Sequence, residues 1–155
     1  MQQACHNIDL YTWFFGLAEK VLSVMDTFDH DIETEDHGAA LLRYPNGMIG
    51  TIVASTVARP GYAARLEVHT SKGSFTMTDD VISNWDIDGV PNPSDASFDY
   101  QHDGATSFAV GDHSAHLEII RDFEHAVETG GKPLVDAHGA RATTELICKI
   151  YEEAR

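Results

Sequence analysis

The sequence predicts an α+β fold, with an open, mostly antiparallel sheet of about six strands and helices packed on one face of it. Strand-like runs alternate with tight turns through residues 21–85, and helical apolar periodicity appears only near the two ends of the chain. No glycine-rich strand-to-helix turn of the dinucleotide-binding type occurs. The 155 residues fit one domain that buries most of its surface.

The first predicted helix covers residues 7–16. Asn7 is the expected N-cap, and Gly16 suits the left-handed position that ends a helix. The apolar and aromatic side chains of this segment recur at helical spacing, and we expect them in the core rather than on a stacking surface. They are Ile8, Tyr11, Trp13, Phe14 and Phe15.

Six strand-like runs follow, near residues 21–25, 37–44, 48–58, 62–70, 74–78 and 81–85. Pro45-Asn46-Gly47 joins the second run to the third and is a strong hairpin signal. The run 48–58 is rich in β-branched residues and carries no charge, so we expect helices on one of its faces and another subunit on the other. The acidic residues 26–36 are expected to form a solvated connection, because they lack the glycine and ligand spacing of an EF-hand loop.

The pattern of the last third of the chain predicts a long irregular segment followed by two helices. Residues 86–112 show no sustained period, and a short edge strand is expected near residues 98–100. An amphipathic helix is expected over residues 116–128, with an apolar face of Leu117, Ile120, Phe123, Ala126 and Val127. Asp136 precedes a final helix over residues 139–154, with an apolar stripe of Ala142, Leu146, Ile150 and Ala154.

Charge and cysteine usage narrow the function class. A formal net charge of −15 repels phosphate backbones and anionic lipid, so we expect no nucleic-acid or membrane partner. Cys5 and Cys148 lie far apart in the sequence and outside any Cys-x-x-Cys pair, which argues against a disulfide framework or a zinc ribbon. The apolar stretch 10–17 is too short to span a bilayer and has no basic leader. We therefore expect a cytoplasmic protein.

The most informative segment for chemistry is residues 2–10, where His6 stands at the entrance of the first helix. The positive end of the helix disfavours an imidazolium, and a neutral imidazole can accept a hydroxyl proton. Asp9 either opposes this effect or orients the ring, depending on geometry. The alternative is that His6 only caps the helix or packs under it.

Several segments, taken in order, resemble the second domain of the Gfo/Idh/MocA oxidoreductases, the glucose-fructose oxidoreductase and inositol dehydrogenase type. The first is Ala4-Cys5-His6-Asn7-Ile8-Asp9-Leu10 with Trp13-Phe14-Phe15-Gly16, which is similar to the His-x-x-Asp-Leu segment that opens that domain. The resemblance continues through residues 40–52, 65–74, 122–133 and 149–154, and so covers nearly the whole chain.

The resemblance implies that this chain, residues 1–155, is the C-terminal substrate-binding and oligomerisation domain of a two-domain parent, without the N-terminal Rossmann domain. That missing domain would hold NAD or NADP and a catalytic lysine in a Glu-Lys-Pro motif. The resemblance assigns His6 as the residue that exchanges a proton with the substrate hydroxyl. It places Gln2, where the family often has Asp or Asn, and Asp9 as substrate-binding groups.

The same resemblance implies a sugar, cyclitol or related polyol as substrate, and a homodimer or homotetramer formed through the sheet face. No cofactor is expected on this chain alone. Two other function classes remain open. One is a non-catalytic, self-associating assembly domain. The other is a small metal-binding protein, because Asp112, His113 and His116 lie close in sequence at the start of a helix.

Overall fold

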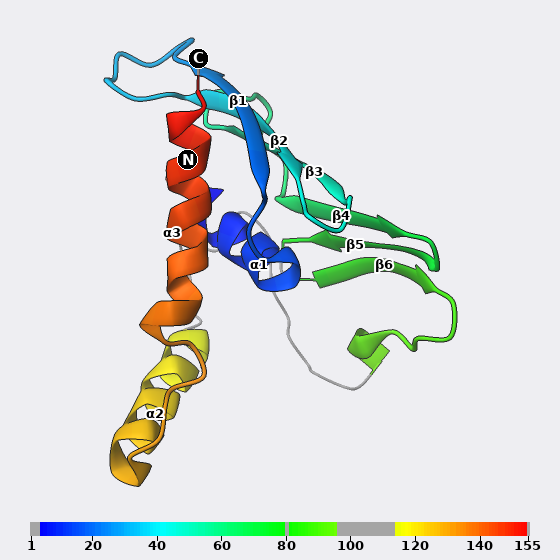
Figure 1. Cartoon of the computed structure of the whole chain (residues 1–155), viewed down its shortest axis with the longest axis vertical. Helices are drawn as coiled ribbons and strands as arrows, with labels where there is room; N and C mark the ends of the chain where they lie inside the picture. Colours follow the sequence, from blue (N-terminus) through cyan, green and yellow to red (C-terminus); the bar gives the residue numbers. More distant parts are fainter. Residues whose placement is uncertain (1–3, 80, 96–113, 155) are drawn as a thin grey trace. The chain divides into compact units, whose positions relative to one another are not determined.

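The computed structural model describes residues 4–79, 81–95 and 114–154 (Figure 1). Three helices and six strands follow the predicted order, and they confirm the α+β class and the antiparallel sheet. The six strands form two sheets of three strands each, β1-β2-β3 and β4-β5-β6. Their contacts divide the chain into two compact units, residues 1–61 with 119–155 and residues 62–118. No helix within the described ranges is long and apolar enough to cross a membrane.

The first sheet is a meander of β1 (Lys20–Asp26), β2 (His37–Arg43) and β3 (Ile49–Ser55). Both pairs are antiparallel and in register along their whole length. The predicted hairpin between β2 and β3 is confirmed, since Gly47 takes a φ of 86° and its amide donates to the carbonyl of Tyr44. A left-handed glycine at this place lets the chain reverse within a few residues.

The two faces of this sheet differ in what covers them. The inward side chains of β1 and β2 are buried, and the helix α3 (Ala137–Glu152) packs against β1. Leu146 and Ile150 of α3 are fully buried, which stabilises the unit by about 2 kcal/mol for each side chain. The opposite face is exposed; its apolar part consists of Leu22, Val24, Leu41, Ile49 and Val53, and Lys20 and Arg43 lie at one end of it.

The helix α1 (Cys5–Phe15) begins two residues before the predicted N-cap. The prediction of Asn7 as N-cap is therefore wrong: Ala4 takes that position and makes no side-chain hydrogen bond. Asn7 lies inside the helix because tertiary contacts extend it, since α1 packs against α3 and crosses it at a steep angle (Figure 1). The predicted end at Gly16 is confirmed by its φ of 69° and by the bond from its amide to the carbonyl of Thr12.

The aromatic residues of α1 do not all enter the core. Tyr11 is buried and Phe15 is half-buried against it, with ring centroids 4.9 Å apart. Trp13 is 78% exposed and Phe14 is 40% exposed, so the prediction that both are core residues is wrong. The cause is helical geometry, because these two positions project away from the stripe that α3 and the sheet bury.

The second unit contains β4 (Arg65–Thr70), β5 (Gly73–Thr78) and β6 (Val81–Ile87), with a short 3₁₀ turn, η2 (Pro93–Asp95), after them. These strands also pair antiparallel, with an irregularity at Thr76/Met77. In the first unit, β3 ends at Ser55, three residues before the end of the uncharged run predicted over 48–58. The Ser55 hydroxyl accepts the amides of Val57 and Ala58, and these two residues leave the ladder.

The remaining helices agree with the sequence pattern. Asp136 precedes α3, as predicted, and it also caps the helix, because its side chain accepts the amides of His138 and Gly139. The helix α2 (Ser114–Thr129) also forms where it was expected. Its predicted apolar face is only partly covered, because Ala126 is buried while Phe123 is exposed. The edge strand expected at residues 98–100 lies outside the described residues.

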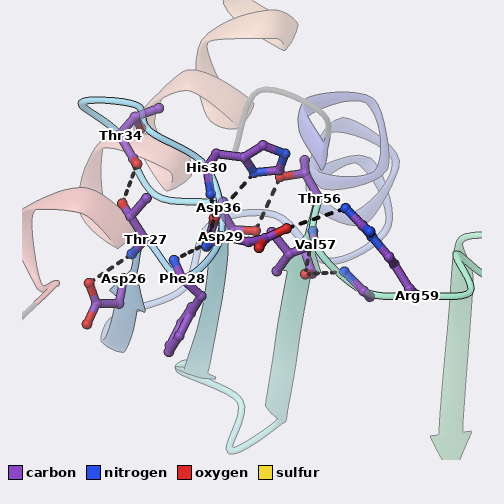
Figure 2. Close-up of polar contacts among 12 residues, drawn as sticks. Asp26, Thr27, Phe28, Asp29, His30, Thr34, Asp36, Thr56, Val57 and Arg59 are labelled. Carbon is purple, nitrogen blue, oxygen red and sulfur yellow. Dashed lines mark hydrogen bonds and ion pairs between the residues drawn. The ribbon is translucent and has the colours of Figure 1, made fainter.

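The acidic connection between β1 and β2 is more ordered than a solvated loop (Figure 2). Asp36 is buried, and its carboxylate accepts the backbone amides of Phe28, Asp29 and His30 at 2.8–3.0 Å. Burial acts to raise the pKa of Asp36, but these donors together outweigh it and hold the pKa at about 2. The backbone carbonyl of Asp36 also accepts the amide of Thr56, which ties the loop to the end of β3.

Candidate functional site

The exposed side of α1 carries the predicted catalytic residue. His6 lies in the first turn of the helix, and its side chain is exposed rather than buried beneath it. Asp9 follows three residues later and Trp13 seven residues later, which places all three on one side of the helix. The alternative that His6 packs under the helix is therefore wrong. Its ring is accessible to a ligand that approaches this side.

The carboxylate of Asp9 is held by the neighbouring helix. Thr143 of α3 donates from Oγ1 to Asp9 Oδ1 at 2.5 Å, although 134 positions separate the two residues. Thr12 lies 2.9 Å from the same threonine, Oγ1 to Oγ1, and donates to the backbone carbonyl of Asp9 at 2.9 Å. Both threonines are buried. Asp9 is thus fixed from the α3 side while the residue as a whole stays exposed.

Thr143 was not predicted as a site residue, although its position in the apolar stripe of α3 could have indicated it. It lies three residues before Leu146 and seven before Ile150, so it shares the buried stripe of α3. A hydroxyl in such a stripe needs a hydrogen-bond partner, because an unpaired buried polar group costs free energy. The third predicted site residue, Gln2, lies outside the described residues.

Tyr11, on the buried side of α1, packs against Tyr44, the residue that follows β2. The rings of Tyr11 and Tyr44 lie 6.4 Å apart between centroids, and both residues are buried. Burial raises the pKa of Tyr11, and burial together with the neighbouring Tyr11 raises the pKa of Tyr44. Both phenols therefore stay neutral at physiological pH. Tyr11 also lies directly over Gly50 of β3, where an added Cβ would stand 1.9 Å from its hydroxyl.

Two hollows of about 620 Å³ each lie at the first sheet, and none of their lining residues belongs to α1. One of them lies over the exposed sheet face, and its lining consists of Leu22, Ser23, Val24, Ala39, Ala40, Leu41, Thr51, Val53 and Glu153. Most of these side chains are apolar. A shallow apolar surface suits contact with another protein better than binding of a polar sugar. The apolar face of the sheet and the His6 side of α1 are therefore two different candidate sites.

The metal hypothesis finds no support within the part of the chain that the structure describes. In that part, no three side chains of the types His, Cys, Asp and Glu come together as a metal site. Asp112 and His113, two of the three residues that suggested the hypothesis, lie outside it. Both cysteines carry free thiols.

Comparison with protein families gives one match. Residues 1–76 match the sequence profile of the family described as GFO/IDH/MocA C-terminal domain. This segment contains α1, the whole first sheet and the position of His6. It confirms the resemblance predicted from the sequence. The curated proteins contain no match to the chain.

Solved structures share the fold. The WlbA dehydrogenase from Bordetella pertussis, solved with NADH and UDP-GlcNAcA, is 23% identical with a TM-score of 0.77, over 99% of this chain and 42% of that one. The UDP-N-acetylglucosamine 3-dehydrogenase GnnA from Acidithiobacillus ferrooxidans is 17% identical with a TM-score of 0.65, over 97% and 45%. A levoglucosan dehydrogenase solved with NADH and levoglucosan is 17% identical with a TM-score of 0.62, over 97% and 47%. The chain spans less than half the length of each of these proteins.

Proposed function

Since residues 1–76 carry a GFO/IDH/MocA C-terminal domain, we propose that the chain is the substrate side of an NAD(P)-dependent oxidoreductase. The reaction it serves is oxidation or reduction at a carbon that bears a hydroxyl on a sugar, cyclitol or related polyol. One observation supports this most strongly. His6 stands exposed in the first turn of α1, with an anchored carboxylate one turn further along the same side.

The proposed role of His6 is general acid and base. A neutral imidazole nitrogen accepts the proton of a substrate hydroxyl as the carbon is oxidised, and the imidazolium returns a proton in the reverse direction. Asp9 contacts a neighbouring hydroxyl and so orients the substrate toward His6. Gln2 supplies a further amide hydrogen bond to the substrate, an assignment that rests on the family resemblance alone.

The strand pairing of the described residues differs from that of the dinucleotide-binding fold. All strand pairs of both sheets are antiparallel, whereas the dinucleotide fold is built on parallel βαβ units with a glycine-rich turn. NAD or NADP, which would accept the hydride, therefore belongs in this proposal to another part of the intact protein. The residues described take no part in that transfer; they bind and orient the substrate and move its proton.

The proposed substrate class has support from the solved structures with the same fold. Two of them were solved with UDP-GlcNAcA or with levoglucosan, and both ligands are carbohydrates. The exposed side of α1 presents an imidazole and a carboxylate, which are the groups that bind hydroxyls. We therefore propose a carbohydrate hydroxyl as the reacting group.

The test is NAD(P)-dependent oxidation of sugars by the intact enzyme that contains this chain. His6→Ala should lower turnover by on the order of a hundredfold or more, because the substrate proton loses its acceptor. His125→Ala, an exposed histidine on α2, is the matched control and should leave turnover unchanged. Equal turnover in the His6→Ala and unsubstituted enzymes would remove His6 from the mechanism.

A second candidate function rests on the exposed face of the first sheet. This face consists of Leu22, Val24, Leu41, Ile49 and Val53, and it carries the hollow described above. A continuous apolar surface of this kind is typical of protein–protein contacts. We propose that it joins two copies of the chain, either within the enzyme or as a purely structural assembly domain.

A further inference from the structure

The junction between α1 and α3 contains a polar contact that packing alone does not require. Thr143 occupies the buried stripe of α3, one turn before Leu146 and two turns before Ile150, which are both fully buried. An apolar residue would fill such a position without the cost of burying a hydroxyl. The threonine instead places its hydroxyl 2.5 Å from Asp9 Oδ1, on the helix that carries His6.

The direction of this hydrogen bond follows from the protons available. Each threonine hydroxyl has one proton, and an ionised carboxylate only accepts. Thr143 is therefore the donor to Asp9. Thr12, whose oxygen lies 2.9 Å from both the Thr143 hydroxyl and the Asp9 carbonyl, shares its single proton between them. Thr143 thus holds Asp9 Oδ1 against α3, and Thr12 contacts the Thr143 hydroxyl and the backbone of Asp9.

The two oxygens of the Asp9 carboxylate therefore differ in their hydrogen bonds. Oδ1 is bound to Thr143, whereas Oδ2 has no hydrogen bond to any residue in the described ranges. Asp9 as a residue is exposed and lies one turn after His6 on α1, and Oδ2 is the oxygen of its carboxylate that Thr143 does not bind. Without the bond from α3, the carboxylate would rotate about its side-chain torsions and present neither oxygen in a fixed direction.

We propose that Thr143 is a positioning residue for the substrate: it fixes Asp9 so that Oδ2 accepts one particular hydroxyl of the sugar beside the hydroxyl that reacts at His6. This inference rests on the function proposed above and deepens it. It assigns a part of substrate recognition to α3, outside the segment 1–76 that matches the family profile.

The experiment measures kcat and KM for the sugar in the intact enzyme, with four single variants of this chain and one double variant. Thr143→Val keeps the shape and removes the hydroxyl, whereas Thr143→Ser keeps the hydroxyl. Thr144→Val is the matched control, because Thr144 is the next residue of α3 and is exposed. Asp9→Ala, alone and combined with Thr143→Val, tests whether the effect passes through the carboxylate.

We expect Thr143→Val to raise KM about tenfold while kcat changes by less than about twofold, as for the loss of a hydrogen bond to a charged group used in binding. Thr143→Ser and Thr144→Val should behave like the unsubstituted enzyme. In the Asp9→Ala background, Thr143→Val should add no further change to KM.

Three results would overturn the inference. One is a Thr143→Val enzyme with unchanged KM and a lowered melting temperature, which would make the contact a structural link only. Another is an equal rise in KM with Asp9→Ala already present. The third is a Thr143→Ser enzyme as impaired as Thr143→Val. Failure of the proposed function looks different, because the unsubstituted enzyme would then oxidise no sugar with either cofactor; that result would also end this inference.

Discussion

At the scale of single residues, the carboxylate of Asp36 shows how one buried acid orders a whole loop. Three consecutive backbone amides bind it, and the ring of His30 adds a contact of 3.3 Å from Nδ1 to Oδ2 (Figure 2). These donors stabilise the ionised form, so the folded protein holds the pKa of Asp36 at about 2. An unfolded aspartate titrates near pH 4.

The pH dependence of stability follows from this difference. A lowered pKa in the folded state contributes stability above the unfolded pKa, and that contribution is lost as the pH falls from about 4 to about 2. Asp36→Asn should therefore lower the melting temperature clearly at pH 7 and much less at pH 2. Asp31→Asn, an exposed acid of the same loop, is the control. An equal loss for Asp36→Asn at both pH values would contradict this explanation.

Local chemistry made several single-residue predictions possible. The helix end at Gly16 and the turn at Gly47 each depend on a glycine acting within a few residues of itself. The contact from Thr143 to Asp9 spans 134 positions. No local pattern specifies it, because the packing of α1 on α3 decides which threonine meets which acid.

At the scale of elements, the fit of α1 on the first sheet depends on a missing side chain. The Tyr11 hydroxyl occupies the space above Gly50 where a Cβ would stand, 1.9 Å away. Tyr11 is buried, so its ring has little room to move aside. The glycine in this uncharged strand thus allows the helix that carries His6 to approach β3 closely.

Gly50→Ala should destabilise the protein by about 1–3 kcal/mol, because the added methyl group overpacks this contact. Thermal or denaturant unfolding measures the change. Gly61→Ala is the control, since a Cβ at that position meets no atom within 4 Å. Adding Tyr11→Phe should recover part of the loss by removing the hydroxyl. Equal stability of the Gly50→Ala and Gly61→Ala proteins would contradict the close packing of Tyr11 of α1 against Gly50.

Where the prediction of a helix or strand was incomplete, its limits depend on contacts with residues far away in the sequence. The pattern of residues 48–58 indicates one long strand, but the Ser55 hydroxyl binds two following amides and ends it early. The start of α1 and the exposure of Trp13 depend likewise on which residues α3 covers. Strand and helix types were predicted because their apolar periods are local, whereas their limits depend on tertiary contacts.

At the scale of the whole molecule, the apolar face of the first sheet predicts self-association. The sequence already indicated a covered strand over residues 48–58, and the structure leaves Leu22 and Val53 of this face about two-thirds exposed. Sedimentation velocity at micromolar concentration should show a dimer or a tetramer. Val53→Asp should shift it toward monomer, because a buried charge without a partner opposes association. Thr144→Asp, on α3, should not. A monomer in the unsubstituted protein would defeat the assembly proposal.

The exposed side of α1 differs from the apolar sheet face, because it presents the imidazole of His6 next to the anchored carboxylate of Asp9. Its proposed role can be tested by replacing the imidazole from solution. We predict that the intact His6→Ala enzyme turns over sugar on the order of a hundredfold more slowly, and that free imidazole restores part of the rate. Full turnover without added imidazole would contradict the proposal that this side of α1 moves the substrate proton.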